Sequence, residues 1–352
     1  MVKVLYADDS RGNNAWYYAR KSFAKAFVGC GHEVLLWDIH SKPAIDIFDQ
    51  FQPDIYIGQT YTLDRGICKA IVERPSLRVI LKGSDYSHYS DSIDISKYPI
   101  LIANDKEIKN VEELNKLHPI DFIFSHYHPN RIQTTHNYWQ DKLGIPVKAI
   151  SLATDITEHT NGEFKEELKS DIAFVSGYWD YKAITLNKWF IPLCSDLNLN
   201  IKVFGNRNWP IPQYCGSIPD SLVRHLHKSA KVCVNIGEPH YKLDGNGDLN
   251  ERTFKLLSNK CPIVQDYSQT IAEDFFPNGE VELAKTPEEF KEKIYAVISG
   301  DLKIDTQKGY DTVMNNHTYF SRVSGLFSYL GMENESIDAL IKYEQIRKDN
   351  NL

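Results

Sequence analysis

The sequence predicts an α/β protein of two domains, each built around a parallel β-sheet. The chain has 352 residues, and one hydrophobic core usually supports a domain of about 100–200 residues. Strand and helix signals alternate along the chain, as they do in strand-helix-strand units. Residues 161–169 interrupt this alternation with a charged stretch that has few apolar side chains. We therefore expect the junction between the two domains there.

The first domain, expected at residues 1–160, opens with the strand KVLYAD at residues 3–8. A polar loop follows at residues 9–14, and after it comes a helix that ends at the glycines on either side of Cys30. The apolar positions of this helix recur at helical spacing: Trp16, Ala19, Phe23 and Phe27. Further strand signals lie in HEVLLWDI, PDIYIGQTY, LRVILKGSDY, DFIFSHYH and PVKAISLATD. The alternation predicts a Rossmann-like sheet.

The second domain, expected at residues 170–318, repeats this alternation. Its strand signals are DIAFVSG, NIKVFGN, YCGSI, KVCVNIGE, CPIVQDY and EVELA. In TPEEF, Thr286 caps a helix and Glu289 reaches back, and the helix stops at Gly300. A last helical stretch, from about Phe320 to Lys348, has no strand after it. We expect residues 319–352 to pack back toward the N-terminal domain and to brace both domains.

Composition indicates a soluble, cytoplasmic protein. The hydrophobic fraction of 42% and the charged fraction of 25% are ordinary for a globular chain, and no stretch approaches the roughly 18 apolar residues of a membrane span. The N-terminus shows no signal-peptide pattern. Six scattered cysteines indicate reduced thiols, which we expect to be small core residues. A net charge of -7 disfavours a broad nucleic-acid footprint.

Polar residues follow several predicted strands of the first domain. In open parallel sheets ligands sit beyond the carboxyl ends of the strands. The residues at these ends therefore form one candidate rim: Asp8, Asp9, Ser84, Asp85, His126 and His128.

The segment LNERTFKLLSNKCPIVQDY, residues 249–267, opens a short helix that leads into a buried strand. Asn250 is a candidate N-cap, and Glu251 and Arg252 occupy the first turn. A helix entrance favours anions, and Arg252 adds a permanent cation with a forked set of donors. A diphosphate is therefore a candidate ligand. The alternative is that Glu251 only favours the helix dipole and Arg252 lies on the surface.

This segment resembles the donor-site motif of the CgeB-like (spore-maturation type) glycosyltransferases, a branch of the GT-B glycosyltransferases. The likeness lies in residues 250–254 (NERTF) and 261–266 (CPIVQD), with support from IKVFGN, FVSG, PNGEVELAKTPEEF and HTYFSR. It covers roughly residues 169–330, and the N-terminal half only by pattern. The resemblance implies two Rossmann-like domains that face a central cleft. It also implies a nucleotide diphosphate-sugar donor, a UDP- or GDP-sugar, held mainly by the second domain.

On this resemblance, the donor-binding residues are expected in five segments of the second domain. They are Ser176, Gly177, Lys182, Gly205, Asn206, Arg207, Asn235, Asn250, Glu251, Arg252, Thr253, Lys255 and Asp266. Lys255 departs from the family pattern, in which a glutamate binds the ribose hydroxyls. Since a lysine cannot accept a hydrogen bond, ribose recognition shifts to Glu251 or Asp266, or donor binding is altered. Lys255 also has the charge to neutralise phosphate.

For transfer with inversion, a carboxylate of the first domain is expected to act as the base. Asp85 is the first candidate, because its position resembles that of the aspartate base in a phage DNA glucosyltransferase of the GT-B class. Asp9 and His126 are the other candidates, and Arg11 and His128 are expected to contact the acceptor. The alternative for Asp85 is a capped turn.

No metal site and no cofactor are expected. The loop from Asp244 resembles the start of a calcium loop, but Leu249 stands where glycine is needed and Lys255 where glutamate is needed. His225 and His227, two apart on a helix, are interpreted as surface residues. The acceptor stays open between a glycan, a protein, a small molecule and a nucleic acid. Two other functions stay open as well: a sugar-nucleotide epimerase on the same scaffold, and a non-catalytic nucleotide-sugar or glycan binder.

Overall fold

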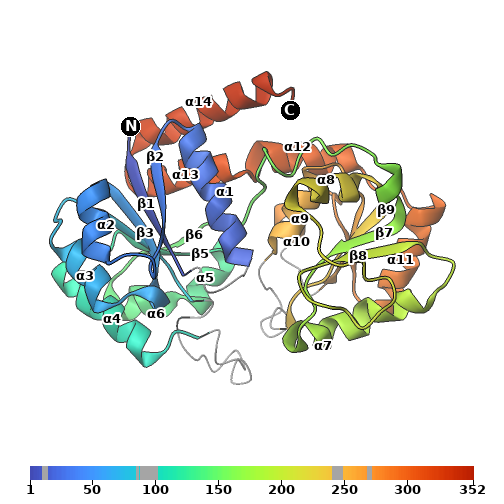
Figure 1. Cartoon of the computed structure of the whole chain (residues 1–352), viewed down its shortest axis with the longest axis horizontal. Coiled ribbons are helices and arrows are strands. Elements are labelled where there is room, and N and C mark those ends of the chain that lie inside the picture. The colour runs from blue at the N-terminus through green and yellow to red at the C-terminus, as the bar shows by residue number, and fades with distance from the viewer. Residues whose placement is uncertain (10–14, 85–86, 88–101, 240–248, 268–271) are drawn as a thin grey trace. The chain divides into compact units, whose positions relative to one another are not determined.

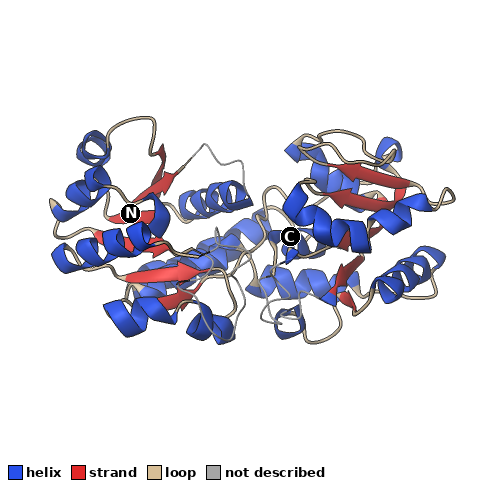
Figure 2. Ribbon diagram, turned by 90° about the horizontal axis from the view of Figure 1, so that it is seen from below, coloured by secondary structure: helices blue, strands red, loops and turns tan. Residues whose placement is uncertain are grey.

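The computed structural model of the chain describes residues 1–9, 15–84, 87, 102–239, 249–267 and 272–352. It divides into two compact units: unit 1 comprises Met1–Ser151 and Tyr319–Leu352, and unit 2 comprises Leu152–Thr318. Helices flank the strands within each unit (Figure 1, Figure 2). Because unit 1 contains both ends of the chain, unit 2 is an insertion into it.

In the described part of unit 1, six parallel strands form one sheet in the order β2-β1-β3-β4-β5-β6. After β1 the chain adds β2 on one side, and β3 then lies on the other side of β1. In such sheets a ligand binds beyond the carboxyl ends of the strands at this reversal. The strands are β1 (Lys3–Asp8), β2 (Glu33–Asp38), β3 (Ile55–Gln59), β4 (Arg78–Lys82), β5 (Phe122–Ser125) and β6 (Val147–Ala149).

Helices α3 and α4 of unit 1 begin at side chains that cap them. Asp64 accepts a hydrogen bond from the Ile67 amide at 2.8 Å, and Asn104 accepts one from the Glu107 amide at 3.0 Å. The helices are α1 (Ala15–Gly29), α2 (Ala44–Phe51), η1 (Thr60–Thr62), α3 (Arg65–Val72), α4 (Asp105–Leu117), α5 (Pro129–Thr135), α6 (Asn137–Leu143), α13 (Tyr319–Tyr329) and α14 (Glu333–Asp349).

Alternate side chains of β1 face two different helix layers. Leu5 and Ala7 pack into the core cluster that includes residues of α2, α3 and α4. Tyr6 faces the other layer, where its ring centroid lies 6.3 Å from that of Phe23 on α1. The Phe23 ring in turn lies 4.9 Å from that of Tyr319 on α13. Helix α13, near the C-terminus, therefore packs in the same core layer as β1 and α1, near the N-terminus.

In the described part of unit 2, five parallel strands form a second sheet, in the order β11-β10-β9-β7-β8. The winding is the same as in unit 1, because its first strand again has the second strand on one side and the third on the other. The reversal lies between β7 and β9. The strands are β7 (Ser170–Val175), β8 (Ile201–Phe204), β9 (Ala230–Asn235), β10 (Ile263–Asp266) and β11 (Glu282–Ala284).

The helices of unit 2 include the one that TPEEF predicts. Thr286 accepts a hydrogen bond from the Glu289 amide at 3.1 Å, and Gly300 ends the helix in the left-handed region. Glu289 reaches back one residue further than in a capping box, to the Lys285 amide at 2.7 Å. The described helices are η3 (Glu166–Leu168), α7 (Asp180–Trp189), η4 (Ile191–Ser195), α8 (Asp220–Lys228), α9 (Glu251–Leu257), α10 (Ala272–Phe275), α11 (Pro287–Ser299) and α12 (Thr306–Asn316).

The predicted fold class is confirmed: the chain holds two parallel α/β sheets. Two predicted elements differ. YCGSI forms no strand, because Gly216 has a φ of 90° and only Tyr214 bridges Val203. The last helical stretch is broken into α13 and α14 at Gly331, whose φ of 71° is left-handed.

The units meet along the chain at Ser151 and Leu152. This junction precedes the charged stretch at residues 161–169, because the segment from Leu152 onward packs within unit 2. The Thr154 hydroxyl lies 2.8 Å from that of Ser258, and the Thr154 amide donates to the His317 carbonyl at 2.9 Å.

None of the six cysteines is in a disulfide, and all six lie in described ranges. Cys215 is exposed, so the prediction that all six are core residues is wrong for it. No helix in the described ranges is both long and apolar enough to cross a bilayer.

Candidate functional site

Arg252 lies at the reversal of the second sheet and joins the carboxyl ends of two strands. Its Nε donates to the carbonyl of Val175, at the end of β7, at 3.1 Å. Its Nη1 donates to Oδ1 of Asn235, the last residue of β9, at 2.7 Å. The guanidinium also lies 5.1 Å from the centroid of the Phe174 ring. A permanent cation is therefore held at the position where doubly wound sheets bind ligands.

Asn250 precedes α9 with extended backbone angles, as predicted for an N-cap, but its side chain does not cap the helix. Instead its amide pairs with that of Asn235: Asn235 Nδ2 donates to Asn250 Oδ1 at 2.9 Å, and Asn250 Nδ2 donates to Asn235 Oδ1 at 2.9 Å. The predicted N-cap position is confirmed, but the side chain makes no capping hydrogen bond, because this pairing occupies its amide. The same pairing attaches the start of α9 to the end of β9.

Thr253 and Gln265 complete this attachment. Asn235 Nδ2 also lies 2.8 Å from Thr253 Oγ1, and the Thr253 hydroxyl donates to Gln265 Oε1 at 3.0 Å. Asn235, Thr253 and Gln265 are all fully buried. Buried hydrogen bonds of this kind fix a geometry, because breaking one leaves a polar group unsatisfied.

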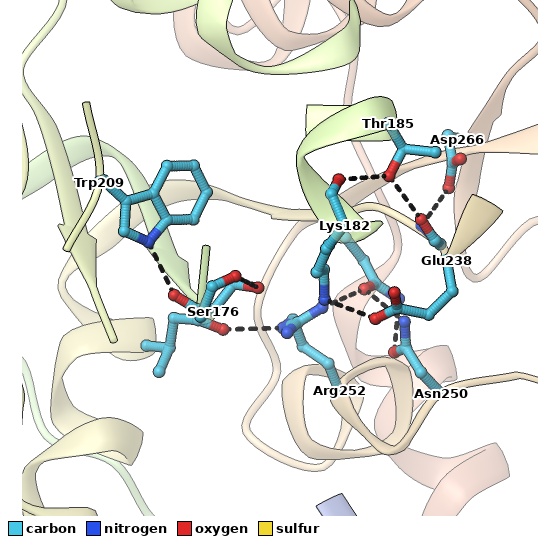
Figure 3. A network of polar contacts seen from close by, with 12 residues as sticks. Ser176, Lys182, Thr185, Trp209, Glu238, Asn250, Arg252 and Asp266 are labelled. Atoms are coloured by element: carbon cyan, nitrogen blue, oxygen red, sulfur yellow. Dashed lines mark hydrogen bonds and ion pairs between the residues drawn. The ribbon is translucent and has the colours of Figure 1, made fainter. Parts of the chain in front are cut away.

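Lys182 on α7 brings a second cation to the same sheet edge. Its Nζ lies 3.1 Å from Glu238 Oε1, and its side chain is buried. Burial lowers the pKa of Lys182, and the positive charge of Arg252 lowers it further, while the carboxylates of Glu238 and Asp266 raise it. Figure 3 shows Lys182 and Arg252 close together, with Glu238 beside Lys182.

Asp266 and Thr185 hold the peptide at Gly237 from both sides. Gly237 donates its amide to Asp266 Oδ1 at 2.9 Å, and its carbonyl accepts from the Thr185 hydroxyl at 3.0 Å (Figure 3). Asp266 is fully buried at the end of β10. Its carboxylate therefore orients the segment that carries Glu238.

Glu251 and Lys255 form an ion pair on α9. Lys255 Nζ lies 2.6 Å from Glu251 Oε2, and Glu251 is buried. Lys255, which stands where the family pattern has a glutamate, therefore contacts Glu251, one of the two residues expected to accept the ribose hydroxyls instead. Burial, then the charges of Arg252 and Lys255, lower the pKa of the nearby His227 to about 3. The interpretation of His227 as a surface residue is wrong, because it is buried.

The glycine turns after β7 and β8 lie against each other. A Cβ atom on Gly205 would be 2.0 Å from the Ser176 carbonyl oxygen, and one on Gly177 would be 3.1 Å from Asn206 Oδ1. Gly205 is required by the close approach of the two strand ends, because its Cβ would meet a backbone atom. Asn206 and Arg207 are exposed at the rim of the turn.

The structure thus brings together Lys182, Asn235, Asn250, Arg252, Thr253 and Asp266 at one edge of the second sheet. Sequence reasoning missed Glu238 as a site residue. Its signal was its place directly after a buried strand, in KVCVNIGE.

The candidate residues of unit 1 that the structure describes lie near the ends of β1 and β5. Asp9 Oδ1 is 3.0 Å from Nε2 of His40. The His126 ring stacks on that of Trp16, with centroids 6.2 Å apart. His128 accepts from the Asn130 amide at 3.3 Å and starts α5. Asp85 and Arg11 lie outside the described residues.

Ser84 was predicted at the rim, but its buried partner Glu107 and the neighbouring Thr60 and Lys82, at the ends of β3 and β4, were missed. Glu107 accepts hydrogen bonds from Thr60 at 2.5 Å and from Ser84 at 2.9 Å. Burial raises the pKa of Glu107, although these hydroxyls and the charge of Lys82 oppose the rise. Lys82 Nζ lies 5.3 Å from the Trp16 ring centroid. The sequence signal for Lys82 was a charged residue at the end of the apolar run RVILK.

Among the described residues, no group of three or more His, Cys, Asp or Glu side chains is arranged to hold a metal ion. The segment from Asp244 to Asp248 lies outside the described residues.

Comparisons with known proteins agree with this architecture. Residues 186–328 match the model of a family described as "Glycosyl transferase-like". No curated protein sequence matches the chain.

Solved structures resemble the whole chain. Sucrose-phosphate synthase from Thermosynechococcus elongatus is 8% identical with a TM-score of 0.58, and the match covers 99% of this chain and 100% of that one. Anabaena HepE in complex with UDP is 9% identical, with a TM-score of 0.60 and coverage of 94% and 100%. An alpha-glucosyltransferase in complex with UDP and a 13-mer DNA containing an HMU base is 12% identical, with a TM-score of 0.60 and coverage of 94% and 99%. The chain has the GT-B fold.

Proposed function

We propose that the protein is a glycosyltransferase that transfers a sugar from a nucleoside diphosphate donor to an acceptor hydroxyl. The observation that carries this proposal is Arg252, fixed by Val175 and Asn235 at the reversal of the second sheet with Lys182 nearby. Two cations at this position suit a diphosphate. The match of residues 186–328 to a glycosyltransferase-like family supports the same conclusion. The NERTF motif supports assignment to the CgeB-like branch.

UDP is the nucleotide that we propose first, and GDP is the alternative. Two solved structures of the same fold contain UDP according to their names. We propose hexosyl transfer, without an obligatory metal, from this donor.

Transfer breaks the bond between the anomeric carbon and the diphosphate oxygen, so negative charge grows on the leaving group. Arg252 and Lys182 are proposed to stabilise that charge, because fixed charges cost no reorganisation during the reaction. Asp85 is proposed as the base that accepts the proton of the acceptor hydroxyl, with Asp9 and His126 as the alternatives. Arg11 and His128 are proposed to contact the acceptor.

Ribose recognition is proposed for Glu251. Asp266 holds the Gly237 amide and so has a role in the fold of the site. A carboxylate has two oxygens and can accept several hydrogen bonds, so the ion pair with Lys255 is compatible with ribose binding. A non-catalytic nucleotide-sugar binder is the second candidate, and the same ion pair is the observation that favours it.

Binding is tested by calorimetric titration with UDP. Arg252→Ala is expected to raise the Kd by about 10- to 100-fold, which corresponds to the ~1.5–3 kcal/mol of hydrogen bonds to charged groups. Arg252→Lys keeps the charge but loses the planar fork, so we expect an intermediate Kd. Arg65→Ala, at an exposed position of unit 1, is the matched control. An unchanged Kd in folded Arg252→Ala would show that the site is elsewhere.

The reaction class is tested with a panel of nucleotide sugars. Slow release of free nucleotide supports a transferase. Interconversion of the sugars would show an epimerase, and tight binding with neither product would show a binder.

A further inference from the structure

Lys182 contacts an aromatic ring and a carboxylate at the edge of the second sheet. Its Nζ lies 5.3 Å from the centroid of the Trp179 ring. The same Nζ lies 3.1 Å from Glu238 Oε1 (Figure 3). Neither Trp179 nor Glu238 has a role in the function proposed above. Both are therefore side chains of the candidate site that the binding of a diphosphate does not explain.

Trp179 presents an aromatic surface at the carboxyl end of β7. It lies in the turn between β7 and α7, directly before the first residue of that helix. The ring packs closely on Gly177, because a Cβ atom there would meet Trp179 Cζ3 at 2.6 Å. Trp179 is nevertheless 37% exposed. The close packing holds the ring in place, and the exposure leaves part of it available to a ligand.

Glu238 presents a hydrogen-bond acceptor near the same amino group. The peptide at Gly237, just before it, is held by Asp266 and Thr185. Glu238 Oε2 is buried and accepts no hydrogen bond from the described residues, although the side chain as a whole is 20% exposed. A buried carboxylate oxygen without a donor is unfavourable, and a ligand hydroxyl is able to supply one. A carboxylate repels phosphate, so Glu238 does not suit the diphosphate itself.

A sugar is the part of the proposed donor that fits an aromatic face together with a carboxylate. Ligand pockets combine aromatic surface with a few polar groups that fix orientation. A hexose has an apolar ring face for the first and hydroxyl donors for the second. In the proposed function, on which this inference rests, Glu251 on α9 binds the ribose at one end of the diphosphate. The groups around Lys182 on α7 then meet the other end, which carries the sugar.

We propose that Trp179 and Glu238 form the subsite for the transferred sugar and select a neutral hexose over a hexuronic acid. The sugar ring packs on Trp179, and its hydroxyls donate to Glu238. The diphosphate already neutralises the positive charges of Arg252 and Lys182. A carboxylate on the sugar would therefore add negative charge beside Glu238, and like charges in contact are costly.

The charge preference is tested by calorimetric titration of the full chain with two matched pairs of ligands. The pairs are UDP-glucose with UDP-glucuronic acid and UDP-galactose with UDP-galacturonic acid, and the members of each differ only in the oxidation of one carbon. The neutral member of at least one pair is expected to bind about 10-fold more tightly or better.

Glu238→Gln keeps the shape of the side chain but removes its charge, so the preference within that pair is expected to fall to about 3-fold or less. The comparison within a pair cancels any change that the variant causes in the binding of the diphosphate. Glu292→Gln, at an exposed position of α11, is the matched control and is expected to keep the full preference.

The aromatic contact is tested by comparing the neutral UDP-sugar with UDP. Trp179→Ala is expected to weaken the UDP-sugar about 5- to 10-fold and UDP less than about 2-fold. Trp179→Phe keeps an aromatic face, so we expect it to recover part of the loss. Leu197→Ala is the control, because Leu197 is 92% exposed and precedes β8, at the opposite end of the sheet.

Equal affinity within both pairs, in a chain that binds UDP through Arg252, would overturn this inference and leave the proposed function standing. So would a Trp179→Ala variant that loses UDP and UDP-sugar affinity to the same extent, because the ring would then contact the nucleotide. A chain that binds none of these ligands would overturn the proposed function as well.

Discussion

Lys182 and His227 show how burial sets the charge of single side chains around α9. Both are buried, and for both burial is the largest cause of a lowered pKa, with Arg252 adding to it. Lys182 also contacts Glu238 at 3.1 Å, and that carboxylate favours its charged form. His227 instead lies near the second positive charge of Lys255. The lysine is therefore the group whose charge can serve an anionic ligand.

For Lys182, we expect UDP affinity to fall as pH rises above neutral. Its pKa is lowered, so its charge is lost at lower pH than that of an exposed lysine. Lys182→Met is expected to weaken binding near neutral pH and to flatten this pH dependence. Calorimetric titrations between about pH 7 and about pH 10 measure both effects. Equal pH dependence in the unmodified chain and the variant would contradict the role of Lys182.

For His227, we expect stability to fall as pH decreases. Its pKa is about 3 in the folded chain and about 6.5 when unfolded. The unfolded chain therefore binds more protons between these values, and the contribution is fully present above the unfolded pKa. Between about pH 7 and about pH 5, the free energy of unfolding of the His227→Gln variant is expected to fall by about 2 kcal/mol less than that of the unmodified chain. Urea unfolding at both pH values checks this, and parallel losses would count against it.

Between elements of unit 2, the turns after β7 and β8 approach each other closely. Gly205 has no room for a side chain, because its Cβ would meet a backbone oxygen at 2.0 Å. Gly325 in α13 differs, since a Cβ there would meet no atom within 4 Å. Replacing these two glycines by alanine is therefore expected to change stability in opposite directions.

Gly205→Ala is expected to destabilise the chain by about 2 kcal/mol or more, because the two turns must separate. Gly325→Ala is expected to stabilise it by about 0.5–1 kcal/mol, since alanine loses less backbone entropy in a helix. Chemical denaturation of both variants measures the difference. Equal effects would show that the close approach of the turns carries no cost.

The elements were largely predictable from the sequence because their signals are local. Apolar runs predicted the strands, and TPEEF predicted the start of α11. The failures are also local: at Gly216 and Gly331, where a left-handed residue ends an otherwise regular pattern. A single sequence gives the glycine but not the sign of its φ.

The candidate site was less predictable, because its contacts join distant segments. Arg252 was identified, but its partner Val175 lies 77 positions away in the chain. The amide of Asn250 was assigned to its own helix, and it pairs with Asn235 instead. Glu238 is recognised as a site residue only through its ion pair with Lys182. Such pairs follow from the sheet order, which periodicity does not specify.

For the molecule as a whole, α13 and α14 are required by unit 1. Phe27 of α1 packs on Phe327 of α13, with ring centroids 5.6 Å apart, and Phe23 packs on Tyr319. Removal of these helices exposes the apolar face of α1 to water. The core of unit 2 is formed by its own residues.

Deletion of residues 319–352 is therefore expected to unfold or strongly destabilise unit 1 and to leave unit 2 folded. Calorimetry is expected to show a transition at low temperature, or none, for unit 1 and a retained transition for unit 2. UDP binding is expected to persist, since the proposed donor residues all lie in unit 2. A single cooperative loss of both units would contradict their independence.

The insertion of unit 2 into unit 1 also orders events during synthesis. All of residues 152–318 emerge from the ribosome ahead of residues 319–352, so unit 2 is able to fold on the nascent chain before α13 and α14 emerge. During that interval the apolar face of α1 is not yet covered by α13. The N-terminal segment is thus the part of the nascent chain with the greatest need of chaperone protection.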